Sequence, residues 1–126
     1  MKHIPVSDSF VPASHEDASQ PGVLKRVIAT HRDFPAGQVM MVNWARLPGS
    51  SSFRRHYHED MQEVFVLVAG HVRMTIDDAR VEMAAGDTII VEAHEIHEML
   101  NLDNSAAEYI VFGISTGQDG QTVVVE

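Results

Sequence analysis

The sequence predicts an all-β protein, built as a barrel or as a sandwich of two sheets. Short apolar stretches follow one another along the chain, turn-forming residues separate them, and no stretch shows the period of an amphipathic helix. Residues 71–76 alternate apolar and polar side chains, which is typical of a strand with one buried face. Many short strands at such spacing are typical of sandwiches and barrels, and 126 residues suffice for one core but not for two.

The chain is expected to consist of an extended N-terminal arm, residues 1–22, and a single barrel domain, residues 23–126. Prolines at positions 5, 12 and 21 stand among polar residues in the arm, and proline disfavours helix because it lacks an amide hydrogen. Residues 31–37 are predicted to form a loop. The predicted strands of the domain are residues 23–29, 38–47, 53–58, 64–68, 71–76, 80–83, 88–91, 97–101, 107–114 and 122–125.

Composition and charge narrow the function classes. The net charge of −9 makes nucleic acid an improbable partner, because nucleic-acid binding depends on Lys and Arg that neutralise phosphates. The apolar runs are strand-length, much shorter than the roughly 20 residues of a membrane helix, so no membrane partner is expected. The sequence contains no cysteine and no apolar N-terminal segment, which fits a protein of the reducing cytoplasm.

Candidate metal donors are concentrated in one stretch and in one distant residue. His56 and His58 are two residues apart, so on a strand they share a face with Cα atoms roughly 7 Å apart. Glu63 opens a buried apolar run, where an unpaired carboxylate is costly. With His97 these residues offer three imidazoles and one carboxylate, a donor set typical of a catalytic rather than a closed structural metal site.

The segment from Gly49 to Asn101 resembles the two signature motifs of the cupins. In the first, Gly49 is followed after six residues by His56, and the motif runs through His58 and Glu63 to Gly70. In the second, Gly86 opens a segment that contains His97 and closes on Asn101. The resemblance implies a double-stranded β-helix, that is, a jelly-roll barrel. It also implies one divalent transition metal ion (Fe, Mn, Ni, Zn or Cu) held by a four-residue donor set: His56, His58, Glu63 and His97.

The sequence departs from the cupin pattern at a few positions. Six residues, not the usual five, separate Gly49 from His56, and Glu92 and His94 stand where the family usually has Pro and Gly. His94 and the neighbouring Glu95 have two interpretations: they support or gate the metal site, or they are solvated turn residues. His3, His15, His31 and His71 lie outside any motif and are expected at the surface.

Side-chain alternation assigns a possible catalytic role to Arg54. If the two ligand histidines point into the barrel, Arg54 points inward as well and Phe53 points away. Arg54 would then lie beside the metal and bind a substrate carboxylate. The alternative is an arginine at the barrel mouth that pairs with Glu59 or Asp60, or a bulge that changes the alternation.

The pocket walls and the outer surface can also be anticipated. Either Asn43 or Trp44 must face into the barrel, and candidate walls are Met40, Phe65, Met99 and Tyr109, each more often core than substrate contact. An outward row of Val64, Val66 and Val68 is apolar, and such faces are seldom left bare in water, so the N-terminal arm or a second subunit should cover it. With the proline-rich arm, this row predicts a homodimer.

The leading functional hypothesis is a metalloenzyme that acts on a small organic molecule, with Glu63 and Arg54 as its catalytic residues. Four protein ligands on an octahedral ion leave two adjacent positions for substrate or dioxygen. Resemblance to the cupins implies dioxygenation as the commonest reaction, with isomerase or lyase chemistry on sugars or keto acids as an alternative. The rival hypotheses are a non-catalytic module that binds a small ligand or a metal, and a structural domain with a vestigial site.

Overall fold

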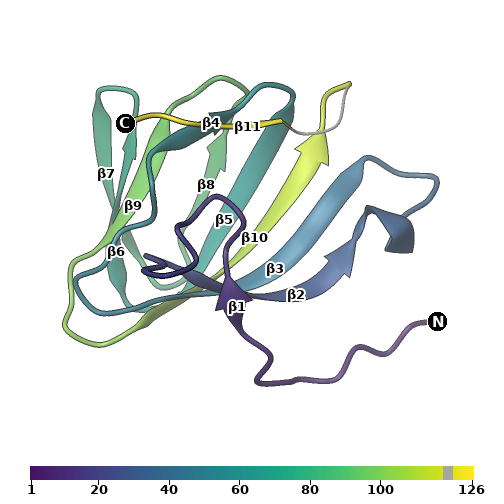
Figure 1. Cartoon of the computed structure of the whole chain (residues 1–126), viewed down its shortest axis with the longest axis horizontal. Helices are drawn as coiled ribbons and strands as arrows, with labels where there is room; N and C mark the ends of the chain where they lie inside the picture. Colours follow the sequence, from purple (N-terminus) through teal and green to yellow (C-terminus); the bar gives the residue numbers. More distant parts are fainter. Residues whose placement is uncertain (118–120) are drawn as a thin grey trace.

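Two antiparallel sheets form the computed structural model, which describes residues 1–117 and 121–126 (Figure 1). One sheet has the strand order β1-β2-β3-β10-β5-β8, and the other has the order β11-β4-β9-β6-β7. The strands are β1 (Val11–Pro12), β2 (Leu24–Thr30), β3 (Val39–Leu47), β4 (His56–His58), β5 (Met61–Ala69), β6 (His71–Ile76), β7 (Ala79–Ala84), β8 (Thr88–Val91), β9 (His97–Asn101), β10 (Ala107–Ser115) and β11 (Thr122–Val124). The all-β prediction is confirmed.

The strand predictions hold closely wherever apolar and polar side chains alternate. The strands at 71–76, 88–91 and 97–101 have the predicted bounds. The stretch 53–58 differs, because only His56–His58 is a strand. Two short elements were not anticipated: β1 within the N-terminal arm, and a 3₁₀ turn, η1 (His31–Asp33), within the predicted loop, which Thr30 caps by accepting from the Arg32 amide.

The hydrophobic core fills the space between the two sheets. Phe65 and Leu67 point inward from β5, and Val72 and Met74 point inward from β6. Cross-strand register keeps neighbours on the same face, so Phe65 lies beside Val111 of β10. In the described part of the chain, no helix combines the length and the apolar character that crossing a membrane requires.

The N-terminal arm is partly integrated into the barrel. β1 pairs with β2, and Ala13, which follows it, is 8% exposed and belongs to the core. The loop after β1 curls back over the barrel (Figure 1). Its Glu16 carboxylate accepts hydrogen bonds from the backbone amides of Gly22 and Arg54, both at 2.7 Å, and the side chain is 2% exposed. Glu16 therefore fastens this loop to the segment that leads into β4.

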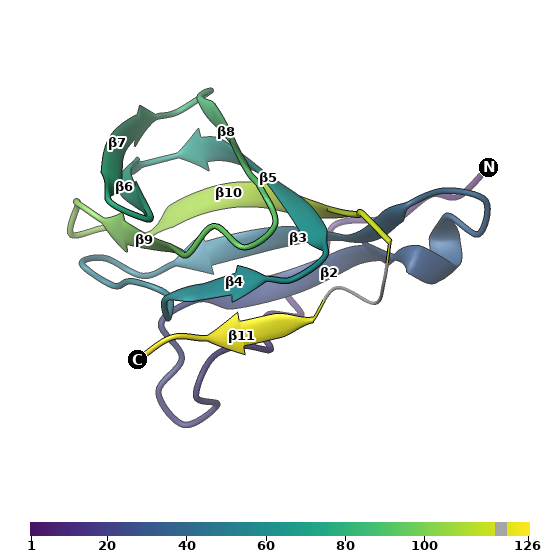
Figure 2. The ribbon, with the colours of Figure 1, turned by 90° about the horizontal axis from the view of Figure 1, so that it is seen from above.

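Strand β4 is held mainly by a partner from the far end of the chain. It pairs along its whole length with β11, and the two strands lie side by side (Figure 2). With β9 it shares only the register pair His56 and His97. The glycine before it is required by packing, because a Cβ at Gly49 would collide with the carbonyl oxygen of Asn104.

Candidate metal centre

The donor set meets at one point between the two sheets. His56 and His58 come from β4, His97 faces His56 across the register of β9, and Glu63 comes from β5 of the opposite sheet. All four side chains belong to residues that are at most 6% exposed. One ligand atom of each lies within 4.8 Å of the others, about twice the roughly 2.0–2.3 Å bond between a metal ion and a nitrogen or oxygen ligand. The group could therefore hold a metal ion.

Each imidazole of the donor set is oriented by a partner of its Nδ1 atom. Nδ1 of His56 lies 2.6 Å from the carbonyl oxygen of Arg54, and Nδ1 of His97 lies 2.9 Å from that of Glu95. A carbonyl oxygen only accepts, so both Nδ1 atoms carry hydrogen, and in the neutral ring each Nε2 atom then keeps a lone pair. Nδ1 of His58 lies 3.0 Å from the hydroxyl of Thr122. These partners set the ring orientation that a metal ligand requires.

Glu63 provides a buried negative charge at the centre. Its Oε1 lies 2.7 Å from Nε2 of His58 and 3.1 Å from Nε2 of His97. Burial raises the pKa of Glu63, but hydrogen bonds from the two imidazoles outweigh it and hold the pKa below its usual range. Because Nδ1 of His97 already carries hydrogen, a neutral His97 would direct a lone pair at this carboxylate. A cation between them, proton or metal, removes that repulsion, so the donor set fits a metal ion.

His56 is electrostatically suited to act as a neutral ligand. Burial lowers the pKa of His56 to about 3, and repulsion from His15 and His97 contributes to the decrease. The ring therefore stays neutral at physiological pH without needing to lose a proton first. Metal binding requires the neutral imidazole, so protons compete weakly at this residue.

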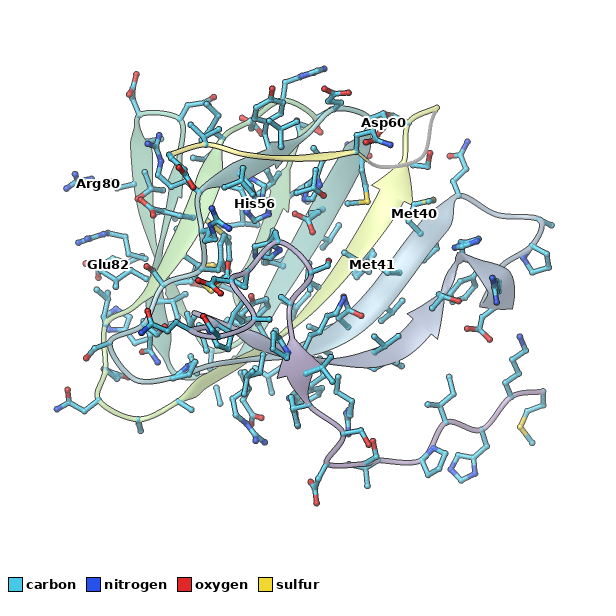
Figure 3. The ribbon with its side chains drawn as sticks, in the orientation of Figure 1. Met40, Met41, His56, Asp60, Arg80 and Glu82 are labelled. Carbon is cyan, nitrogen blue, oxygen red and sulfur yellow. The ribbon has the colours of Figure 1, made fainter. Side chains whose placement is uncertain are left out.

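A cavity of about 310 Å³ adjoins the donor set. His56 from β4 and Met41 from β3 both line this interior space, and both side chains are labelled in Figure 3. Of the anticipated walls, Met40, Phe65 and Tyr109 line the cavity, whereas Met99 is fully buried in the core. Burial raises the pKa of Tyr109, which therefore keeps its hydroxyl hydrogen at physiological pH.

The alternation around the centre differs from the prediction for Arg54. Its guanidinium pairs with Glu126 at 2.6 Å, its side chain is 39% exposed, and it does not line the cavity. Phe53 instead faces inward, is 2% exposed, and contacts the rings of His56 and His97. The expected inward position of Arg54 is wrong because the strand begins only at His56, so the period of two does not extend back to residues 53 and 54.

Sequence reasoning missed His15. Its ring stacks on that of His56 with the centroids 4.1 Å apart, and its 18% exposed side chain lines the cavity. Nε2 of His15 lies 3.2 Å from Oε2 of Glu16 without hydrogen-bond geometry, and burial lowers the pKa of His15. Nothing local indicates this position, because the contact joins segments distant in sequence and is made from a loop. His3 and His31, in contrast, are exposed as expected.

The turn before β9 acts on the donor set through its backbone. His94 has φ +70°, the left-handed conformation that glycine adopts most readily. This explains why the cupin pattern described above usually has glycine at this position. The amide of His94 donates to the carbonyl oxygen of His58 at 2.7 Å, while the carbonyl of Glu95 orients His97. The side chain of Glu95 accepts from the Glu92 amide and stays within the turn.

An antiparallel β-barrel with a buried set of three imidazoles and one carboxylate beside an internal cavity defines a class of small proteins with a candidate metal centre. The family model described as a cupin domain matches residues 43–113, which is more than half of the chain. The chain therefore belongs to the cupin family.

Several solved structures share the fold. An uncharacterized conserved protein with a double-stranded β-helix domain from Klebsiella pneumoniae has a TM-score of 0.74 and 14% identity, with 100% of this chain and 99% of that chain covered. A predicted oxalate decarboxylase from Thermotoga maritima has a TM-score of 0.69 and 22% identity, with 74% of this chain and 80% of that chain covered. A sugar phosphate isomerase of the cupin superfamily from Silicibacter pomeroyi has a TM-score of 0.63 and 23% identity, with 75% of this chain and 60% of that chain covered. The predicted jelly-roll fold is confirmed.

Proposed function

We propose that the protein is a metal-dependent enzyme that acts on a small organic molecule, with the donor set holding one divalent transition metal ion. The observation that carries the proposal is the orientation of the three imidazoles: each Nδ1 atom has a partner outside the donor set, and the Nε2 atoms of His58 and His97 meet at Oε1 of Glu63. The adjoining cavity supports a substrate of small size. When bound, the ion would supply Lewis-acid polarisation or redox chemistry.

The chain's own residues have separate roles in this proposal. Glu63 supplies the negative charge that an ion needs and, through its buried position, keeps that charge in a medium of low dielectric. Tyr109 offers a protonated hydroxyl to substrate from the cavity wall. Met40, Met41 and Phe65 make that wall apolar, which excludes water around a bound molecule.

Dioxygenation is the reaction proposed first, and isomerase or lyase chemistry is kept as the second candidate. The second is favoured by two structural neighbours whose names are a predicted oxalate decarboxylase and a sugar phosphate isomerase. The test begins with elemental analysis of protein purified without added metal. Dioxygen consumption and substrate loss are then measured with the iron-loaded protein and a panel of catechols, thiols and keto acids. Substrate-dependent uptake that is lost in Glu63→Gln supports the oxygenase.

Turnover of a keto acid or sugar without dioxygen uptake would support the isomerase or lyase. Binding without turnover, retained by Glu63→Gln, would overturn the enzyme proposal in favour of a small-ligand binding module. A protein that binds none of the candidate divalent ions would overturn the metal site itself.

We also propose that a second copy of the chain covers the outer face of β5. Val64 itself is only 9% exposed, but Ile90 opposite it on β8 is 57% exposed and Val68 is 41% exposed. This face is apolar and forms a surface suited to association. Light scattering at micromolar concentration tests it, and a monomer would contradict it. The lack of cysteine is consistent with the proposed cytoplasmic location.

A further inference from the structure

The wall of the cavity opposite the donor set carries two polar side chains on neighbouring strands. In the register of β2 and β3, Lys25 lies opposite Ala45, and Val27 lies opposite Asn43. Ala45 is buried in the core, so Lys25 and Asn43 share the inward face as diagonal neighbours, roughly 7–8 Å apart. The alternation is confirmed by Arg26, which lies on the outer face over the ring of Trp44.

Asn43 is a buried amide whose oxygen has no partner in the part of the chain that the structure describes. The residue is 7% exposed, lines the cavity, and its Oδ1 forms no hydrogen bond with any described residue. Buried amides are usually satisfied, because they lose their hydrogen bonds to water on burial. An amide offers both a donor and an acceptor, so it can bind a ligand that enters the cavity.

Lys25 is a cation without a carboxylate partner. It is half-buried, lines the cavity, and forms no ion pair within residues 1–117 and 121–126. What distinguishes Lys25 from the other basic residues without an ion pair is its place, because it alone of the lysines and arginines lines the cavity among the described residues. A positive charge on the cavity wall therefore has no counter-ion from the described part of the protein.

We propose that Lys25 and Asn43 form a subsite for a carboxylate group of the ligand, across the cavity from the donor set. The inference rests on the proposed function in one respect, because it assigns the other end of the ligand to the metal centre. Asn43, Val111 and Phe65 follow one row across β3, β10 and β5, which spans about 10 Å at the usual strand spacing.

The subsite specifies a ligand class. One ammonium and one amide match the single charge of a carboxylate better than the double charge of a phosphate. The ligand is then a short bifunctional acid, with a chelating group at one end and a carboxylate at the other. This assigns to Lys25 the role that the sequence suggested for Arg54, since Arg54 is paired with Glu126 away from the cavity.

The test compares 2-oxo diacids of five to seven carbons with 2-oxo monoacids of the same carbon number, by calorimetry on metal-loaded protein. The wild type should bind at least one diacid about tenfold more tightly than its matched monoacid. Lys25→Met should remove most of this preference, Asn43→Leu should reduce it, and Lys25→Arg should retain it. Lys2→Met is the matched control, because it removes the same charge from an exposed site and should leave the preference unchanged.

Metal content and thermal midpoint, measured on every variant, show that Lys25→Met is folded and retains its ion. No diacid preference in the wild type at any length, or a preference that persists in Lys25→Met, overturns the subsite. If the wild type binds no metal, the proposed function fails and the subsite is decided separately with metal-free protein, by comparing glutarate with pentanoate. A glutarate preference lost in Lys25→Met then supports the subsite, and no preference overturns it.

Discussion

The polar groups on the two walls of the cavity differ in whether other residues of the protein bind them. On the donor-set wall, the Nδ1 atom of each imidazole has a partner at 2.6–3.0 Å. On the wall of β2 and β3, the amide oxygen of Asn43 has no partner among the described residues and Lys25 has no ion pair there. The first wall is preorganised by bonds that the protein makes itself, and the second keeps groups available for a ligand. This difference in hydrogen bonding distinguishes the residues that orient the donor set from the residues that we propose bind the ligand.

The strongest way to break the donor-set wall is to remove one of the imidazoles that accompany Glu63. His97→Ala in metal-free protein should lower the free energy of unfolding by about 3–5 kcal/mol, because it leaves a buried charge with one partner fewer. Urea unfolding measures the change. His31→Ala, at an exposed position, is the control and should change stability by less than about 0.5 kcal/mol. An equal loss in both variants would contradict the buried-pair explanation.

Lowering the pH should reduce the free energy of unfolding through the same donor set. The pKa of His56 is about 3 in the folded protein, against 6.5 for an unperturbed imidazole, so between these values the unfolded chain binds more protons. Stability is therefore complete above about pH 6.5 and falls as pH decreases. From about pH 6.5 to about pH 5 this residue alone should cost the metal-free protein about 2 kcal/mol. Urea unfolding across this range should show a flatter profile in His56→Gln; an equally steep profile would exclude His56 as its origin.

Removing an orienting partner should lower metal affinity and leave the fold intact. Thr122→Val deletes the hydroxyl beside Nδ1 of His58 and should weaken metal binding about 10- to 100-fold. Competition with a chelator of known affinity measures this. Thr88→Val on the exposed side of β8 makes the same chemical change and should leave metal affinity unchanged. Equal affinities in both variants would show that the hydroxyl does not orient the ring.

On the wall of β2 and β3, a substitution should stabilise the protein, whereas substitutions in the donor set should destabilise it. Asn43→Leu replaces an unsatisfied buried amide with an apolar side chain of the same branched shape, and the adjoining cavity leaves room for its larger methyl groups, so it should raise the free energy of unfolding by about 1 kcal/mol. Metal content should not change, since Asn43 is not part of the donor set. Denaturant unfolding and elemental analysis together check the expectation. A loss of stability would indicate that the amide is satisfied, for example by an ordered water molecule.

Three members of the donor set could be anticipated from the sequence because their spacing is local, and His97, which is distant in sequence, was added through the resemblance to the second cupin motif. Two histidines two residues apart share a strand face whatever the rest of the fold does, and Glu63 precedes a strongly apolar strand segment. The all-β fold could be anticipated in the same way, since alternation in β6 reports its buried face directly. These are properties of single strands.

Some cavity walls were anticipated, but other residues around the donor set were not, because their positions depend on where strands begin and on contacts distant in sequence. Arg54 lies just before β4, so extending the alternation backwards exchanged it with Phe53. His15 reaches His56 from a loop with no periodic pattern. The sequence could place Lys25 on a strand. That Lys25 has no ion pair among the described residues follows only from the three-dimensional positions of the carboxylates.

Strand β4 is held by segments from both ends of the chain. Glu16 binds the amide of Arg54 just before it, and Thr122 contacts His58 within it, while the amide of Val125 donates to the carbonyl oxygen of Arg55. During synthesis on the ribosome, residue 56 is made long before residue 122, so the first ligand histidine waits without its supporting strand. His58 gains its Thr122 partner only when β11 has emerged and docked. Any metal ion that the donor set takes up would therefore meet a fully oriented set of ligands only at that late stage.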